Sequence, residues 1–592
     1  MGFTHSTKWL GMALAGMLGT GIPAMAHETG ACGDDLEADR PEARALAARR
    51  VEWTEKGANP RSWREVKVLG FNDFHGQLSP RTVGTRPAGG AAVLASYLKA
   101  AQAGMEDRTV IVHAGDHVGA SPPASALLQD EPAISFLNLL GNAHCSSWWR
   151  MNPRCNLVGT LGNHEFDEGR AELLRLLYGG AHPEGPFLED PYRGTTFPYV
   201  SANVVDARRG EPLLPPYVVK MLRGIPVGFV GAVTRTTPRI VTPAGVAGLA
   251  FEDEAVAINR AVAKLKRQGV RAIVVTIHEG DRMTTYEGPT NPDLPGPGGS
   301  IADIVERLDD EVDVVVSGHA HSFTNALVKT STGKTVLVTQ AFSSSTAYAD
   351  ISLKLDPFTR DVVAKSAAVY TTWADAGPGL TPDPKVAALV KRAEDAVAPL
   401  VNRVLGTSAQ DITRTVSPAG ESALGNLIAD AQRAKMGTDF AFMNPGGIRA
   451  DLDAGAITWG ELFTIQPFAN DLVRMDLTGA QVKTVLEQQW SDPARPRILQ
   501  VSGLTVRYDS SLPSGSRIVS VRKGGVELDP AGLYSVTVNS FLAGGGDGFV
   551  ELLNGANRVV GPVDLDGLVE YVLGFEGEPV STTIEGRISQ VN

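Results

Sequence analysis

Short runs of β-branched and aliphatic residues recur between about residues 66 and 356, separated by polar and Gly-rich stretches. Runs of this kind predict buried strands where turn residues bound them. The strands are expected at 66–71, 109–113, 156–160, 272–277, 312–317 and 335–339. Between them, residues 90–103 and 254–268 repeat apolar positions with the period of an amphipathic helix. Strands that alternate with helices in this way predict a layered α/β domain.

A second domain is expected after a break in this pattern. Residues 372–384 are rich in Gly, Pro and Asp, and a helical period resumes over 385–400, which predicts a boundary followed by a linking helix. Beyond about residue 406, further elements with their own Gly-rich turns are long enough to form a separate core. The predicted limits are 1–26 for a signal peptide, 27–63 for an N-terminal extension, 64–372 for the first domain, 373–405 for the linker and hinge helix, and 406–592 for the second domain.

The N-terminal residues have the pattern of a secretory signal. His5 and Lys8 precede an apolar, Gly-rich stretch, and Ala24, Met25 and Ala26 have the small-x-small form of a cleavage site. The alternative is a membrane anchor, but the stretch is short and broken by glycines, and no other segment reaches the roughly 18 apolar residues that span a bilayer. The mature protein is therefore expected to be exported, to the periplasm or outside the cell, without a membrane anchor.

Export would permit disulfide bonds. Cys145 and Cys155 flank a short excursion of the chain and are expected to form a local disulfide, with two reduced thiols as the alternative. Cys32 lacks a large aliphatic residue three positions before it, so we do not expect a lipoprotein. The partner of Cys32 stays open.

Composition and charge narrow the class of partner. Of the 592 residues 43% are apolar and 20% are charged, which is typical of globular proteins. The 54 Lys and Arg residues against 66 Asp and Glu residues leave a net charge of −12. A chain this acidic has no overall field to hold a nucleic acid polymer, so any phosphate must be bound by local groups.

Side chains with metal-binding chemistry stand directly after five of the predicted strands. Open α/β sheets place their ligand sites at this edge. The residues are, in chain order, Asp73, His75, Asp116, Asn163, His164, His278, His319 and His321. Taken singly, each could cap a turn or lie in the core. Together they supply the carboxylate, amide and imidazole ligands that a site for two ions requires.

This ordered set, DxH, GD, GNHE, a strand-end His and GHxH, resembles the calcineurin-like metallophosphoesterases, and the GNHEFD form at 162–167 is similar to the bimetallic 5'-nucleotidase family. The resemblance implies an α-β-β-α sandwich for the first domain and a second α/β domain that binds substrate. It implies one ion on Asp73, His75, Asp116 and His321, and another on Asp116, Asn163, His278 and His319. Two divalent ions, of Zn, Mn, Co or Fe, are therefore expected.

The same resemblance assigns catalytic residues. It implies that His164 contacts the transferring phosphoryl group and that Asp167, three residues later, orients His164 and raises its pKa. For Asp167 the alternative is a solvated carboxylate at a helix start.

Three motifs of the second domain resemble the 5'-nucleotidase C-terminal domain: NPGGIR at 444–449, QPFAN at 466–470 and FLAGGGDGF at 541–549. The resemblance implies Phe468 and Phe541 as a pair that stacks on the base, Asp547 as a ribose-binding carboxylate, Asn444 as a base-edge contact, Gly446 and Gly447 as points of close backbone approach, and Arg449 as a substrate-binding arginine. Alone, such motifs usually form turns and cores.

This sequence departs from the family pattern at two places in the second domain. Pro445 stands where glycine is frequent, and no arginine directly precedes Ala423, the nearest upstream being Arg414. Nucleoside recognition is therefore more firmly predicted than tight binding of a multiply charged phosphate.

The expected function is an exported, metal-dependent phosphoric monoester hydrolase that converts nucleoside 5'-phosphates to nucleoside and phosphate, acting as a monomer or weak dimer. One alternative is a 2',3'-cyclic nucleotide phosphodiesterase or a UDP-sugar hydrolase with the same ions. The other is a non-catalytic nucleotide-binding surface protein, against which the complete ligand set argues.

Overall fold

The structure is a computed structural model that describes residues 62–283, 285–492 and 495–591. The predicted signal peptide at 1–26 and Cys32 lie outside the described residues, as does almost all of the predicted extension at 27–63.

Two mixed six-stranded sheets form the centre of the first domain, in the orders β16-β15-β1-β4-β5-β6 and β13-β14-β12-β11-β9-β8. The first sheet consists of β1 (Arg64–Phe71), β4 (Thr109–Ala114), β5 (Leu157–Thr160), β6 (Tyr199–Val200), β15 (Ala347–Leu355) and β16 (Val362–Thr371). The second consists of β8 (Tyr217–Leu222), β9 (Ile225–Val233), β11 (Ala272–His278), β12 (Val312–Val316), β13 (Phe323–Lys329) and β14 (Thr335–Ala341). All six strands predicted from the sequence are confirmed within one or two residues at each end.

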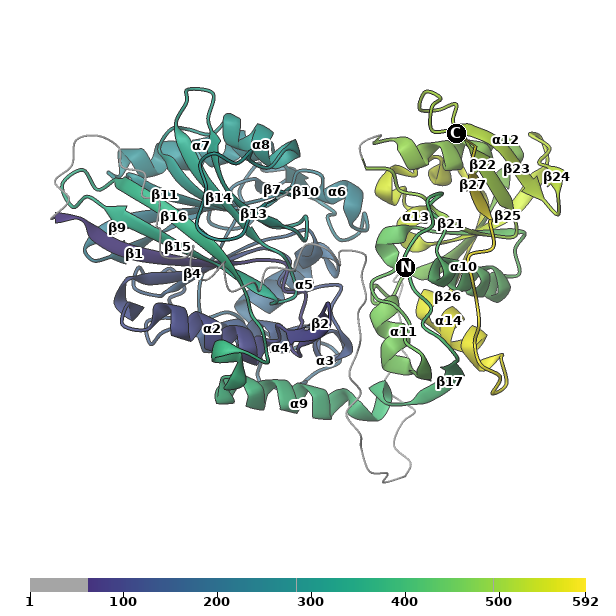
Figure 1. Ribbon diagram of the computed structural model, residues 1–592, viewed down its shortest axis with the longest axis horizontal. Coiled ribbons are helices and arrows are strands. Elements are labelled where there is room, and N and C mark those ends of the chain that lie inside the picture. The colour runs from purple at the N-terminus through teal and green to yellow at the C-terminus, as the bar shows by residue number, and fades with distance from the viewer. Residues whose placement is uncertain (1–61, 284, 493–494, 592) are drawn as a thin grey trace.

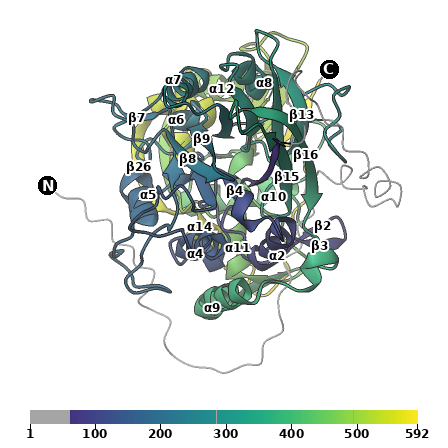
Figure 2. The same ribbon diagram turned by 90° about the vertical axis from the view of Figure 1, so that its left-hand side faces the viewer.

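The two sheets pack face to face, and helices cover their outer faces. Alternate residues of β1 and β4, such as Val68 and Val112, join the core between the sheets, while Leu69 and Ile111 point to the helical layer. That layer contains α2 (Ala91–Gln102), α4 (Glu131–Leu140) and α5 (Gly169–Tyr178). On the other side, α7 (Glu254–Arg267) and α8 (Gly299–Glu306) pack on the second sheet. The result is the α-β-β-α sandwich predicted from the sequence, seen from two directions in Figures 1 and 2.

The strand directions explain why distant residues meet. In the first sheet β1, β4 and β5 are parallel, and in the second β9, β11 and β12 are parallel. The carboxyl ends of parallel strands lie at one edge of a sheet, where ligands bind in open α/β folds. Both edges open toward the second domain in Figure 1, and the loops after β1, β4, β5, β11 and β12 bring their Asp and His side chains close to one another.

The second domain contains a five-stranded sheet in the order β21-β18-β25-β20-β26 and a four-stranded sheet in the order β24-β23-β22-β27. Their bounds are β18 (Phe440–Met443), β20 (Asp471–Thr478), β21 (Gln500–Ser502), β22 (Thr505–Tyr508), β23 (Ile518–Lys523), β24 (Val526–Glu527), β25 (Leu533–Asn539), β26 (Ala556–Val563) and β27 (Ile588–Gln590). A two-stranded sheet pairs β17 (Val404–Ser408) with β19 (Gly455–Thr458). The helices are α10 (Ala423–Met436), α11 (Trp459–Ile465), α12 (Gly479–Glu487), α13 (Ser540–Ala543) and α14 (Asp564–Leu573).

One long helix, α9 (Pro384–Val401), links the domains and runs beneath them in Figure 1. Asp383 caps its N-terminus by accepting hydrogen bonds from two backbone amides, which offsets the unpaired donors of the first turn. Its apolar face, with Leu389 and Ala393, is buried in the core of the first domain. At its other end Val401 packs against Gly460 of α11. The helix is thus part of the first domain's packing along most of its length.

Two further sequence predictions can be compared with the structure. Cys145 and Cys155 form a disulfide, as expected. Among the described residues, no helix has the length and apolar composition that crossing a bilayer requires.

Candidate active site

Five of the predicted metal ligands have a backbone conformation that side chains normally avoid. Their φ angles are positive: 51° at Asp73, 49° at His75, 49° at Asp116, 75° at His319 and 46° at His321. A non-glycine residue in this region costs on the order of 1 to 3 kcal/mol, and such strain clusters at functional sites. The loops after β1, β4 and β12 are therefore held in strained turns that direct these side chains into one site.

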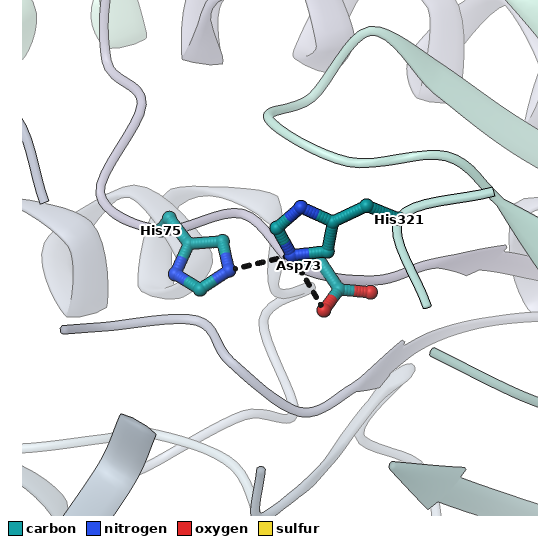
Figure 3. Close-up of side chains that lie close together, drawn as sticks. All are labelled: Asp73, His75 and His321. Carbon is teal, nitrogen blue, oxygen red and sulfur yellow. Dashed lines mark hydrogen bonds and ion pairs between the residues drawn. The ribbon is translucent and has the colours of Figure 1, made fainter. Parts of the chain in front are cut away.

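Asp73, His75 and His321 form the first group of possible metal ligands, shown in Figure 3. Nε2 of His75 lies 3.0 Å from Nε2 of His321, and Nε2 of His321 lies 3.3 Å from Oδ1 of Asp73. The carboxylate of Asp73 also accepts hydrogen bonds from the backbone amide of His319, which ties the loop after β12 to the loop after β1.

Asp116, His278 and His319 form a second group. Nε2 of His278 lies 3.0 Å from Oδ2 of Asp116, 3.2 Å from Nδ1 of His319 and 3.1 Å from Oδ1 of Asn163. The same Oδ2 atom of Asp116 is 3.7 Å from Nε2 of His75, which belongs to the first group. Asp116 therefore stands between the two groups.

The hydrogen bonds of two histidines show that the site suits cations. Nδ1 of His75 contacts the carbonyl oxygen of Gly119 at 2.9 Å, and Nδ1 of His278 contacts that of Ala114 at 2.9 Å. A carbonyl oxygen can only accept, so Nδ1 carries the proton and the lone pair of Nε2 points into the site in the neutral ring. Nitrogen lone pairs that face each other and a carboxylate at about 3 Å are the arrangement that a divalent ion satisfies. The residues present thus fit divalent metal ions.

Charge and burial shift the pKa values of these groups strongly. Burial by itself lowers the pKa of His278, but the carboxylates of Asp116 and Asp73 outweigh it and raise the pKa to about 10. For Asp116, burial would raise the pKa, and the neighbouring imidazoles hold it well below the ordinary range instead. Opposite charges therefore stabilise each other in the place where the ions would bind.

Glycines let the motif loops approach each other closely. A Cβ atom at Gly162 would lie 2.1 Å from Oδ1 of Asp116. At Gly115, where φ is +81°, it would lie 2.6 Å from Nδ1 of His278. The glycines that precede Asp116 and Asn163 in the sequence motifs are thus required by contacts between loops.

Glu165, to which no role was assigned from the sequence, connects two of these loops. Its buried carboxylate accepts hydrogen bonds from the backbone amides of Asp116 at 3.0 Å and His117 at 2.8 Å, and from that of Gly162 in its own loop. Burial, reinforced by the charge of Asp116, raises its pKa to about 7. The GNHE motif placed Glu165 beside the ligands, but its partners after β4 are 48 and 49 residues away in sequence.

His164 and Asp167 form a close pair at the mouth of the site. Nδ1 of His164 lies 2.7 Å from Oδ2 of Asp167, and the His164 backbone amide donates to Oδ1 of Asp116 at 2.8 Å. Burial lowers the pKa of His164, but Asp167 and Asp116 outweigh this effect and the pKa is raised. His164 also groups with His75 and Asp116 as a possible third ligand cluster. The Asp167 contact leaves Nε2 of His164 available for a ligand or a substrate.

Two other histidines near Asp116 belong to the core. His113 is hydrogen-bonded to the hydroxyl of Tyr199 at 2.9 Å, and His117 contacts the carbonyl oxygen of Ala133 at 2.8 Å. The His117 ring stacks on Phe74, and burial lowers its pKa to about 3. Neither histidine belongs to the ligand groups of the described residues.

A cavity of about 510 Å³ joins the predicted metal site to the predicted nucleoside-binding residues. From the first domain it is lined by the metal-site residues Asp116, Asn163, His164, Asp167, His319 and His321. From the second domain it is lined by Asn444, Gly446, Gly447, Arg449, Phe468, Phe541 and Asp547. Asp73, His75 and His278 lie deeper, with side chains almost completely inaccessible to solvent. The structure therefore brings together all predicted site residues from both halves of the chain.

The nucleoside end of the cavity is built around a polar pair. Nδ2 of Asn444 donates to Oδ2 of Asp547 at 3.1 Å, and Oδ1 of Asn444 accepts from Nδ2 of Asn539 at 3.0 Å. The ring of Phe541 lies on Gly546, where a Cβ atom would come within 2.5 Å of it. The cavity lining also includes residues without a role predicted from the sequence, among them Asn470, which ends the QPFAN motif, and Arg497, which lies outside the three motifs.

Both departures from the family pattern have a structural explanation. Pro445 begins the 3₁₀ turn η5 (Pro445–Gly447), where its fixed φ and missing amide proton are tolerated. Arg414 reaches the NPGGIR loop and donates to the carbonyl oxygen of Arg449 at 3.0 Å. Burial lowers the pKa of Arg449, and the charge of Arg414 lowers it further. A second guanidinium is therefore present beside Arg449, although it comes from another part of the sequence.

The fold and the ligand groups define the class to which this chain belongs, that of the metal-dependent phosphoester hydrolases. A family model described as calcineurin-like phosphoesterase matches residues 66–323, and one described as 5'-nucleotidase, C-terminal domain, matches residues 404–554. The chain belongs to the 5'-nucleotidase family, which combines these two domains.

Two relatives match most of this chain, and a solved structure named as a 5'-nucleotidase shares its fold. The cell wall protein Lmo0130 of Listeria monocytogenes is 35% identical over 566 residues, which cover 88% of this chain and 69% of that protein. The endonuclease YhcR of Bacillus subtilis is 36% identical over 561 residues, covering 92% of this chain but only 42% of that protein. The crystal structure of a 5'-nucleotidase precursor from Thermus thermophilus superposes with a TM-score of 0.72 at 29% identity, covering 89% of this chain and 100% of that one.

Proposed function

We propose that this protein is an exported phosphohydrolase with two divalent ions, which hydrolyses nucleoside 5'-phosphates to nucleoside and phosphate. One observation carries the proposal: a single cavity contains the candidate metal ligands of the first domain and the nucleoside-binding side chains of the second. A nucleotide has the same two parts, an anionic phosphate and an apolar base joined by a hydroxylated sugar. The cavity therefore matches the substrate at both ends.

At the phosphate end, Asp73, His75, Asp116 and His321 would hold one ion, and Asp116, Asn163, His278 and His319 the other, as Zn, Mn, Co or Fe. When bound, such ions lower the pKa of water and offset negative charge on the phosphoryl group. His164 directs Nε2 at a phosphoryl oxygen while Asp167 holds its Nδ1 proton. The raised pKa of His164 favours the imidazolium form, whose Nε2 proton can be donated to the developing charge.

At the nucleoside end, Phe468 and Phe541 bind the two faces of the base, and Asp547 and Asn444 receive the sugar and the base edge. Gly446 and Gly447 allow the ligand to approach the backbone, and Arg449 binds the phosphate. Since the two ends belong to different domains, neither domain alone recognises the whole substrate.

Further parts of the proposal concern the chain as a whole. The disulfide and the relative named as a cell wall protein support export, to the periplasm or outside the cell. The family matches at 66–323 and 404–554 support domains at 64–372 and 406–592, with 373–405 as linker and hinge helix. A monomer or weak dimer is proposed.

The test is phosphate release by the purified protein. We expect release from AMP when Mn, Co or Zn is supplied, and none after chelation. ADP, ATP, UDP-glucose and 2',3'-cyclic AMP are assayed in parallel, since the same ions could serve a cyclic phosphodiesterase or a UDP-sugar hydrolase. An aryl phosphate without a base reports on the metal site alone. Hydrolysis of the aryl phosphate without any of AMP would contradict the proposed nucleoside site.

A further inference from the structure

Arg497 is a cationic residue of the nucleoside end of the cavity for which the sequence motifs provide no role. It lies in the segment before β21, near the 3₁₀ turn η6 (Gln488–Trp490). Its backbone amide donates to the carbonyl oxygen of Gln489 at 2.8 Å, and the Gln489 side chain accepts from the amide of Leu499 at 2.7 Å. The position of Arg497 is thus fixed by a buried glutamine.

The guanidinium of Arg497 contacts Asp547 at two points. Its Nε lies 3.3 Å from Oδ1 of the carboxylate, and its Nη1 lies 3.5 Å from the carbonyl oxygen of the same residue. The other carboxylate oxygen, Oδ2, accepts from Asn444 at 3.1 Å. One carboxylate oxygen therefore faces the guanidinium and the other accepts a hydrogen bond from an amide, so that the group is held from both sides.

Asp547 needs this support for two reasons. Its φ of 56° is strained for a residue with a side chain, so its backbone gains from a fixed carbonyl. Burial raises the pKa of Asp547, whereas the charge of Arg497 lowers it. Without Arg497 the carboxyl group would be easier to protonate and freer to rotate.

A carboxylate held by one ion pair and one hydrogen bond still has a lone pair on each oxygen that can accept a further hydrogen bond. Two adjacent lone-pair acceptors match two adjacent hydroxyl groups. We propose that Arg497 is a positioning residue that orients Asp547 to accept hydrogen bonds from the 2'- and 3'-hydroxyl groups of a ribose, so that the substrate class is ribonucleotides. This inference rests on the proposed function and adds to it the discrimination between sugars.

The test compares AMP, 2'-deoxy-AMP and an aryl phosphate in the metal-loaded full-length protein. In Arg497→Met the KM for AMP should rise about 10- to 100-fold, the scale of one hydrogen bond to a charged group, with little change in kcat. The ratio of kcat/KM for AMP to kcat/KM for 2'-deoxy-AMP should fall toward one in this variant. Arg497→Lys, which keeps the charge without the planar fork, should retain part of this sugar preference. Unchanged aryl phosphate turnover shows that the variants are folded.

Two further variants separate positioning from a general effect on the segment. Arg495→Met is the matched control, because Arg495 pairs with Asp281 of the first domain at 3.3 Å rather than with Asp547, and it should keep the sugar preference. Asp547→Asn should lose the preference, and adding Arg497→Met to it should cause little further loss, because the two residues act as one unit.

Several results would overturn the inference. They are an unchanged sugar preference in Arg497→Met, an equal loss in Arg495→Met, or independent losses from Arg497→Met and Asp547→Asn. Equal wild-type turnover of AMP and 2'-deoxy-AMP would overturn it while leaving the proposed function intact. Wild-type protein that cleaves the aryl phosphate but neither nucleotide would instead remove the proposed function and this inference together.

Discussion

The ring of Phe468 stacks on the imidazole of His164 across the boundary between the domains, with ring centroids 5.7 Å apart and planes inclined by 17°. Phe468 follows α11 in the second domain, and His164 begins the 3₁₀ turn η3 (His164–Phe166), which follows β5 in the first. The predicted phosphoryl contact and one of the predicted base-stacking rings therefore touch each other. The guanidinium of Arg449 also lies over the Phe468 ring, 5.8 Å from its centroid, so the ring contacts side chains from both domains.

This contact separates the roles of the two phenylalanines. Phe541→Ala should raise KM for AMP and spare an aryl phosphate, because Phe541 lies on Gly546 in the second domain. Phe468→Ala should impair AMP hydrolysis and also slow aryl phosphate turnover several-fold, because His164 loses the ring that orients it. Each stacked ring is worth about 1 to 3 kcal/mol for base binding. Steady-state kinetics on both substrates measure the difference, and equal losses in both variants on both substrates would show that the rings are structural.

His164→Ala should lower kcat for AMP by about 10² to 10³, the loss expected when one preorganised donor to a developing charge is removed. The metal content should stay near that of the wild type, since the two ligand groups with the closest contacts do not require His164. Kinetics together with metal analysis of the purified variant check both statements. Asp167→Asn is the comparison, and a smaller loss is expected because it removes only the support of the Nδ1 proton. Loss of metal in His164→Ala would make His164 a ligand.

Asp116→Asn should abolish activity and metal binding together. Its Oδ2 atom is the one that approaches both histidine groups, 3.0 Å from Nε2 of His278 and 3.7 Å from Nε2 of His75. The wild-type protein should melt at a higher temperature as Mn²⁺ is added, because an ion that binds only the folded state stabilises it by about 2.7 kcal/mol at 100 times its dissociation constant. The melting temperature of the variant should not change with Mn²⁺.

Asp293→Asn, in an exposed loop, is the control and should behave like the wild type. A variant that retains both activity and the response to Mn²⁺ would contradict the bridging position.

Lys220 predicts how stability depends on pH. Its side chain is completely buried, and its Nζ donates to the carbonyl oxygen of Asn152 at 3.3 Å. Burial lowers its pKa from 10.5 to about 7. Between these two values the unfolded chain binds more protons than the folded one, so this residue makes the free energy of unfolding rise as the pH increases from about 7 to 10.5.

Lys220→Met should therefore stabilise the protein at pH 7, by about 1 to 3 kcal/mol, the range for a buried polar group with incomplete partners. The difference from the wild type should shrink toward pH 10. Urea unfolding at several pH values measures it, with the exposed Lys483→Met as the control. A variant that is less stable than the wild type at pH 7 would show that the ammonium group is held by favourable interactions.

Much of the metal site could be predicted from the sequence because its residues are local to strand ends. A strand followed by Asp, His or Asn is visible as a short motif, and parallel strands bring such ends to one edge whatever the details of packing. For this reason Asp73, Asp116, Asn163 and His278 could be named as candidates before the fold was known. The glycines beside them belong to the same motifs, although only the structure shows that Gly162 makes room for Asp116.

Other features had no local signal. Strand β9 was not predicted, because Gly228 and Gly231 interrupt its apolar run; the structure needs them, since a Cβ atom at Gly231 would lie 2.0 Å from the carbonyl oxygen of Val200. Glu165 acts on backbone amides almost fifty residues away. Arg497 has no local sequence signal either, because its partner Asp547 is 50 residues further along the chain.

The chain by itself determined which chemical groups are available and at which strand ends they stand. The tertiary structure decided which of them meet: the stacking of Phe468 on His164, the approach of Arg414 to Arg449 and the support of Asp547 by Arg497. The physical reason is that hydrogen bonds, charge effects and ring contacts act over a few ångströms in space. Periodicity and motifs report only on neighbours along the chain, so contacts between domains and between distant loops become visible only once the chain is folded.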